Sequence, residues 1–197
     1  MQLADAEEVA AAVAAAFNVG QMGLPEPIPT ATLPRRGLLY LTEVDLTEIQ
    51  FEAISCGAKR LGDDWLYLSY AERSAPLVAP RLPPLSPLSL EDFRLDAHDY
   101  PAYLECAPDA GLDHVLVSPR AVWGVYVDNM GIAVVAGDDD FIDAVYASLP
   151  PALDQAVQFT EDILSTNHQG LERWIAKLLE DVLGSQTAEQ VLGEATG

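Results

Sequence analysis

The sequence predicts a single α+β domain over residues 1–197, in which an antiparallel sheet of about five strands packs against helices. Three observations support this class. Half of the residues are apolar, which is enough for one sizeable core. β-Branched and aromatic runs with turn signals between them indicate a central meander over 114–137. Beyond residue 150 the apolar residues recur at helical spacing, which indicates a C-terminal helical hairpin.

The first part of the chain mixes helical and strand patterns. The alanine-rich start favours a helix because Val9, Val13 and Phe17 share one face. Short runs dense in apolar and aromatic residues indicate strands. The stretch 47–61 fits a helix, although part of it also alternates as a strand does. The elements predicted here are a helix at 4–17, strands at 37–42 and 65–70, and a helix at 47–61.

Two proline-rich stretches interrupt this pattern. Prolines lack the amide hydrogen that regular structure needs, so 24–36 and 76–87 are expected to be extended connectors. The second is the best candidate for a subdivision of the domain. Ser89 and Asp92 then resemble a capping box, which predicts a helix through Phe93, and a second short helix is expected at 100–106.

The meander is the clearest segment. Its three strands are expected at 115–117, 122–127 and 132–136, with turn chemistry between the last two. On the middle strand Trp123 and Val125 share one face while Tyr126 lies on the other. Because both faces are apolar, both should be covered.

Helices account for the remainder. One follows Gly137 and ends before Pro150, and two apolar stripes after it form the hairpin, with a short optional turn at 187–192. Ile175, Leu179 and Leu183 make the second stripe wider than one core contact needs. That surplus leads to the expectation of a homodimer through the C-terminal helices.

Charge is the most unusual property of the chain. Thirty-one acidic residues face ten basic ones, giving a formal net charge of −21. Residues 99–197 hold seventeen of the acids and three of the bases. Such a field repels nucleic acid and anionic lipid surfaces and attracts basic proteins. With no apolar run near the ~20 residues needed to cross a bilayer and no secretion signal, we expect a cytoplasmic protein.

The densest acidic group is Asp138, Asp139, Asp140 and Asp143. The last three fit the Asp-Asp-x-x-Asp pattern with which isoprenoid synthases hold magnesium diphosphate, but the strand signals disagree with that all-helical fold. We prefer an acidic helix N-cap as their structural role. Asp128 belongs to the hairpin turn of the meander.

Other catalytic or cofactor chemistry lacks a supporting pattern. The three histidines have no ligand-pair spacing, although His98 or His114 could in principle serve Cys106 or Ser118 as a base. Cys56 and Cys106 are expected to be free, buried thiols. Phosphate-binding glycine motifs do not occur. We therefore expect no cofactor and no resident metal, and consider a non-enzymatic role more plausible than an enzymatic one.

A protein-binding function fits these observations best. In size and charge the chain resembles immunity proteins of bacterial toxin systems, which implies docking to a basic protein and neutralising it. The residues expected to contact that partner are Asp128, Asp138, Asp139, Asp140 and Asp143. Two alternatives stay open. One is a homo-oligomeric structural protein, and the other is a divalent-metal-dependent enzyme of small molecules that uses the acids of 138–143.

Overall fold

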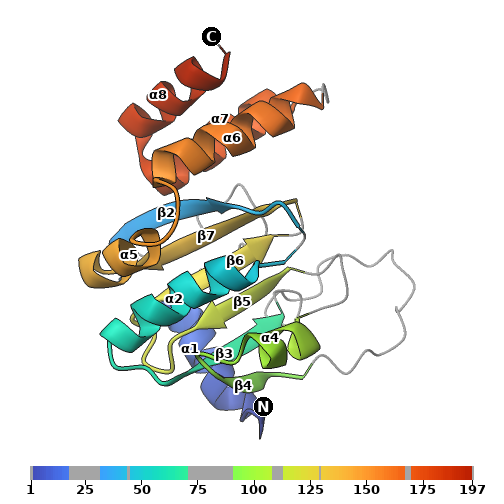
Figure 1. Ribbon diagram of the computed structural model, residues 1–197, viewed down its shortest axis with the longest axis vertical. Coiled ribbons are helices and arrows are strands. Elements are labelled where there is room, and N and C mark those ends of the chain that lie inside the picture. The colour runs from blue at the N-terminus through green and yellow to red at the C-terminus, as the bar shows by residue number, and fades with distance from the viewer. Residues whose placement is uncertain are drawn as a thin grey trace.

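The computed structural model describes residues 2–17, 32–43, 45–70, 91–107, 113–128, 130–166 and 170–196. Within them a seven-stranded antiparallel sheet has the order β1-β4-β3-β5-β6-β7-β2 (Figure 1). The strands are β1 (Gln2–Leu3), β2 (Arg35–Tyr40), β3 (Trp65–Tyr70), β4 (Phe93–Asp96), β5 (His114–Val117), β6 (Gly124–Asp128) and β7 (Ile132–Gly137). The α+β class is confirmed, with seven strands instead of about five.

Helices cover both faces of this sheet. On one face lie α2, α4 and α5, and on the other lie α1 and, towards the β2 edge, α6, α7 and α8 (Figure 1). Val125 of β6 belongs to the first core and Tyr126 to the second, and both are fully buried. The helices are α1 (Ala6–Ala16), α2 (Glu48–Arg60), α4 (Tyr100–Cys106), α5 (Asp139–Tyr146), α6 (Ala152–Ser165), α7 (Leu171–Leu183) and α8 (Ser185–Thr196).

The ambiguous stretch after residue 46 forms the helix α2, and its first turn explains why. The Thr47 side chain accepts from the Gln50 amide, while Gln50 Oε1 accepts from the Thr47 amide, which completes a capping box. Phe51 and Ile54 then turn to the core at helical spacing. The cap outweighs the short alternating pattern because it satisfies amides that a helix start leaves free.

The helix predicted from Ser89 through Phe93 is wrong in its described part, which leads into the strand β4, between β1 and β3 in the sheet. Phe93 and Leu95 alternate with the outward Arg94 and Asp96, and this period of two matches a strand paired with β3. Asp92 accepts a hydrogen bond from Ser69 Oγ at 2.7 Å, across to β3. Ser89 itself, like the predicted boundary at 76–87, lies outside the described residues, so that subdivision stays a prediction.

The C-terminal hairpin gains a third helix. The optional turn at 187–192 is part of α8, which packs on both α6 and α7. Ile175 and Leu179 are fully buried within the chain, and Leu183 is partly buried against the same core. The apolar surplus that suggested a homodimer is therefore largely used inside the molecule. None of the described helices combines the length and the apolar character that crossing a bilayer requires.

The contact between α1 and the sheet depends on a glycine, Gly124, whose lack of a side chain leaves room for Phe17. Phe17, directly after α1, is fully buried against Gly124 of β6. A Cβ atom on Gly124 would stand 2.6 Å from the Phe17 ring, closer than packed atoms come. Glycine at this position thus lets the end of α1 lie directly on the strand.

Gly124→Ala should lower the free energy of unfolding by about 1–3 kcal/mol, because the ring of Phe17 must be displaced from a packed core. The matched control is Gly193→Ala in α8, where an added Cβ meets nothing within 4 Å. That control should raise stability by about 0.5–1 kcal/mol through helix propensity. Urea unfolding of both variants measures the difference, and equal effects would contradict the packing argument.

Candidate functional site

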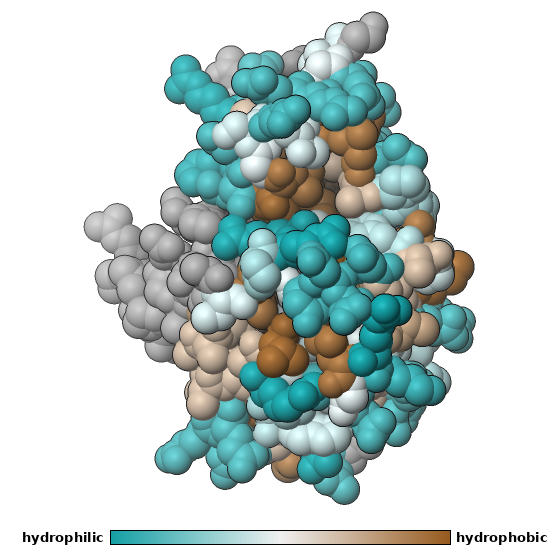
Figure 2. All heavy atoms as spheres, turned by 90° about the vertical axis from the view of Figure 1, so that its left-hand side faces the viewer, coloured by the Kyte–Doolittle hydropathy of each residue, from teal (hydrophilic) through white to brown (hydrophobic). Residues whose placement is uncertain are grey.

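At one end of the sheet, β2, β3 and β6 begin and β4, β5 and β7 end. The strand register shows this, because Arg35 is paired with Gly137, Val117 is paired with Gly124, and Trp65 is paired with Asp96. We call this the α5 end, because α5 begins here directly after β7. Figure 2 views this end from outside: its surface is mainly hydrophilic, with apolar atoms visible where it is hollowed below the C-terminal helices. A hollow of about 470 Å³ at this level is lined by residues 34–36, 180–184 and 187.

The four acids predicted around residue 140 lie together at the α5 end. Asp138 caps α5, accepting a hydrogen bond from the Phe141 amide at 2.9 Å, which confirms the expected N-cap. Asp139 and Asp143 both contact Nη1 of Arg35, at 3.1 and 2.8 Å. Hydrogen bonds from Arg35, first to Asp143 and then to Asp139, raise the pKa of its guanidinium.

The same group also uses a second cation. Asp140 lies 3.0 Å from Nη2 of Arg60, at the end of α2. Asp139, Asp140 and Asp143 are each more than 60% exposed. The Asp-Asp-x-x-Asp spacing therefore holds guanidinium groups here. Among the described residues, no three His, Cys, Asp or Glu side chains are grouped so that they could hold a metal ion. Two arginines against four aspartates leave this surface with a negative excess.

Asp128 does not join this group. It pairs with Ile132 at the opposite end of β7, about 17 Å from the start of α5 by strand geometry. Its side chain is buried, and its Oδ1 accepts from the Met130 amide at 2.7 Å. Burial, and then the nearby charge of Asp113, raises the pKa of Asp128 from 3.8 to about 6.

Because the folded state holds this proton more tightly, the ionised carboxylate weakens folding above about pH 6. The contribution of Asp128 to stability should fall as the pH rises from 3.8 to about 6 and then stay lowered. Asp128→Asn keeps the acceptor for Met130 and removes the charge. It should raise the free energy of unfolding by about 1–3 kcal/mol near neutral pH, from a shift of roughly two pKa units at about 1.4 kcal/mol each.

This gain should shrink as the pH is lowered from about 6 and vanish below 3.8, where Asp128 is protonated in both states. Urea unfolding across this pH range measures it, with the exposed Asp64→Asn as control. A variant that is less stable than the parent at neutral pH would contradict the raised pKa.

His114 and Ser118 do not pair as a base and its nucleophile. His114 is buried, with Nε2 2.9 Å from the Tyr103 hydroxyl. Ser118 lies four residues farther along the chain, about 13 Å away by strand geometry, and donates to Asp63. Cys106 is buried and burial raises its pKa, whereas Cys56 is exposed, contrary to the expectation, because α2 turns it outward.

Asp63 forms the most connected polar centre at the α5 end. This buried carboxylate accepts from the Ser118 hydroxyl at 2.8 Å and from Nε1 of Trp123 at 2.9 Å, both on Oδ2. Its Oδ1 accepts from Nε and Nη2 of Arg120, at 3.0 and 2.9 Å. The turn between β5 and β6, including Ala121 at a positive φ of 54°, is thereby fixed to the end of α2.

Asp63→Ala removes the acceptor of two buried donors and of a guanidinium, so it should lower the free energy of unfolding by about 2–4 kcal/mol. Asp64→Ala, at the exposed neighbouring position, should change it by less than about 0.5 kcal/mol. Urea unfolding, followed by tryptophan fluorescence, measures both. Similar losses in the two variants would argue against a structural role for the Asp63 carboxylate.

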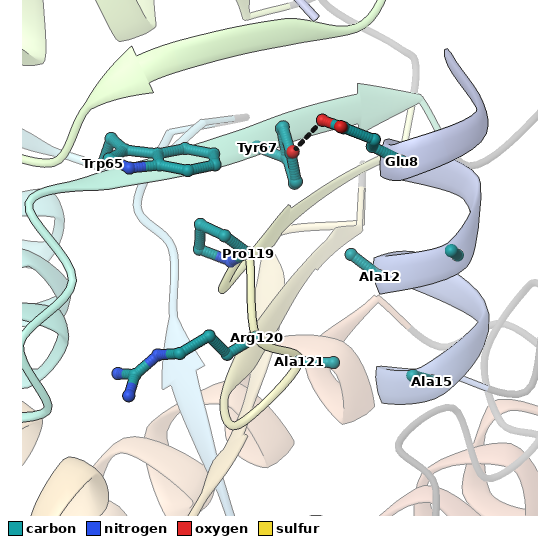
Figure 3. A pocket seen from close by; sticks show the side chains of 9 residues that line it. Glu8, Ala12, Ala15, Trp65, Tyr67, Pro119, Arg120 and Ala121 are labelled. Carbon is teal, nitrogen blue, oxygen red and sulfur yellow. Dashed lines mark hydrogen bonds between the residues drawn. The ribbon is translucent and has the colours of Figure 1, made fainter. Parts of the chain in front are cut away.

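An open groove that the sequence patterns did not indicate lies between α1 and the start of β3 (Figure 3). Its volume is about 520 Å³. The walls come from three separate parts of the chain, which explains why no local motif announces it. The lining residues are Glu8, Ala11, Ala12, Ala15, Trp65, Tyr67, Pro119, Arg120 and Ala121.

Two polar groups of this groove, the Tyr67 hydroxyl and the Glu8 carboxylate, are hydrogen-bonded to each other. The Tyr67 hydroxyl donates to Glu8 Oε2 at 3.0 Å, which ties α1 to β3. Burial, followed by the hydrogen bond to Glu8, raises the pKa of Tyr67. The rings of Trp65 and Tyr67 meet edge to face, 5.0 Å apart between centroids.

Comparison with models of protein families, with curated proteins and with solved structures finds no match for this chain.

Proposed function

We propose that the protein is a cytoplasmic binding module that docks a cationic partner protein through carboxylates of its C-terminal half, with the acids of α5 in the contact. One observation carries the proposal. In the described residues from 130 onward, twelve acidic side chains face two basic ones, and eleven of the twelve are exposed. A surface of this kind accelerates encounter with a basic partner and repels acidic ones.

The pairing at α5 is compatible with this role. Asp139 and Asp143 share the single cation of Arg35, so one negative charge is left over at that position. Exposed ion pairs of this type contribute only about 0–1 kcal/mol, so a partner's lysine or arginine can replace Arg35 at small cost. Asp128, being buried, has no direct contact in the proposed complex. Immunity-type neutralisation of a basic toxin is the specific form of this function that size and charge favour.

The partner is sought by capture on the immobilised protein from the native cell extract, at about 0.05 M and about 0.5 M salt. We expect a protein of basic isoelectric point that is retained at low salt and released at high salt. Recovery of only neutral or acidic partners, or binding that salt does not weaken, would contradict the proposal.

Kinetics with the captured partner then test the role of α5. The triple variant Asp139→Asn, Asp140→Asn, Asp143→Asn should lower the association rate constant about tenfold, with a smaller change in dissociation. The matched control Glu172→Gln, Glu189→Gln, Glu194→Gln removes the same charge from exposed positions of α7 and α8. Equal slowing by both variants would mean that net charge alone matters and that α5 is not the contact.

A further inference from the structure

The groove between α1 and β3 has a distinct chemical character. One wall is aromatic, from Trp65 and Tyr67, and the opposite rim carries the exposed carboxylate of Glu8. The Tyr67 hydroxyl donates to Oε2 of that carboxylate, and the charge of Glu8 raises the pKa of Tyr67 by more than the charge of Arg94 lowers it. An aromatic wall beside a carboxylate attracts a positively charged group, through the ring quadrupole and through direct charge.

The cation that also lines the groove does not block it. The guanidinium of Arg120 is held away from Glu8 by Asp63 and by the carbonyl oxygen of Leu61 (Figure 3). Only the aliphatic part of Arg120 therefore faces the groove near Glu8. The remaining lining residues are small, namely alanines of α1 together with Pro119 and Ala121. These walls leave room for an unbranched aliphatic stem behind a charged head.

Trp65 already binds a cation within this chain. The guanidinium carbon of Arg94 lies 3.8 Å from the centre of its ring. Trp65 also borders a second hollow of about 510 Å³, at the edge of β4, where Asp64 and Asp96 supply exposed carboxylates. The half-buried indole thus borders two hollows that each contain a carboxylate, at the same end of the sheet as α5.

We propose that this groove receives a lysine or arginine side chain of the cationic partner. The charged head binds Glu8 in front of Trp65 and Tyr67, and the aliphatic stem lies against the alanines of α1. The inference rests on the proposed function and adds to it a specific contact apart from the acids of α5. Charge complementarity selects the occupant, because Glu8 and the aromatic faces both favour a cation.

Octalysine, blocked at both ends, serves as the probe, and nuclear magnetic resonance of the tryptophan indole N–H groups serves as the readout. Trp65→Phe assigns the Trp65 signal. At about 0.02 M salt the Trp65 signal of the parent should shift saturably with octalysine, whereas that of the buried, Asp63-bound Trp123 should not. Octaglutamate should shift neither signal.

Glu8→Gln keeps an acceptor for Tyr67 and removes the charge, so it should weaken octalysine binding by about three- to tenfold. The matched control is Glu7→Gln, an identical charge change on the neighbouring residue, which does not line the groove. It should weaken binding by less than about twofold. Thermal unfolding of both variants verifies that α1 remains docked.

A steric pair tests the groove without any change of charge. Ala15→Met places a side chain into the groove and should abolish the Trp65 shift, whereas Ala14→Met, exposed outside it, should leave the shift intact. Equal weakening by Glu8→Gln and Glu7→Gln, or a Trp65 signal that octalysine leaves unmoved in the parent, would overturn the groove proposal. Neither result affects the capture of a basic partner, so the proposed function is tested separately by that experiment.

Discussion

The carboxylate of Asp63 is the constraint on which the α5 end of the sheet depends. Its two oxygens hold the indole of Trp123, the hydroxyl of Ser118 and the guanidinium of Arg120. Trp123 in turn stacks on Phe141 of α5, with centroids 5.0 Å apart and the planes 12° from parallel. One buried charge therefore orients the helix that presents the acidic surface and also the turn that forms a wall of the groove.

Glycines complete this arrangement by allowing helices to approach closely. A Cβ on Gly57 of α2 or on Gly137 of β7 would stand within 2.7 Å of the Phe141 ring. Phe141 is thus enclosed between a helix, a strand and the indole of Trp123, and it is fully buried. Such enclosure fixes the direction in which α5 projects its aspartates, so the acidic surface is held by the core and not by its own ion pairs.

Sequence patterns predicted those parts of the fold whose signals are local. The meander followed from β-branched and aromatic runs with turn residues between them, and the start of α5 followed from the capping preference of Asp138. β4 was missed because the capping signal at Ser89 and Asp92 was given more weight than the alternation of its four residues. The extent of α8 was missed because its own apolar signal is weak. Only contact with α6 and α7 buries Ala188 and Val191.

The candidate sites also divide into those with a local sequence signal and those that only the fold brings together. The acids of α5 are adjacent in sequence and were found, whereas the groove joins Glu8, Trp65 and Pro119, which are brought together only by the fold. Asp128 was grouped with the α5 acids by composition, yet a strand of six residues separates them. Distance along a strand is as decisive as distance in sequence, because a strand extends by about 3.3 Å per residue.

The basic residues explain how so acidic a chain keeps defined local structure. Of the eight that the structure describes, six are engaged within the chain: Arg35, Arg36, Arg60, Arg94, Arg120 and Lys177. Their pairing leaves the net charge unchanged, so the long-range field still attracts cations. At short range they fix which carboxylates are shared and which rings are stacked. A partner drawn in by the general field would thus meet a few defined contacts, and specificity would come from those contacts, while the field sets the rate of encounter.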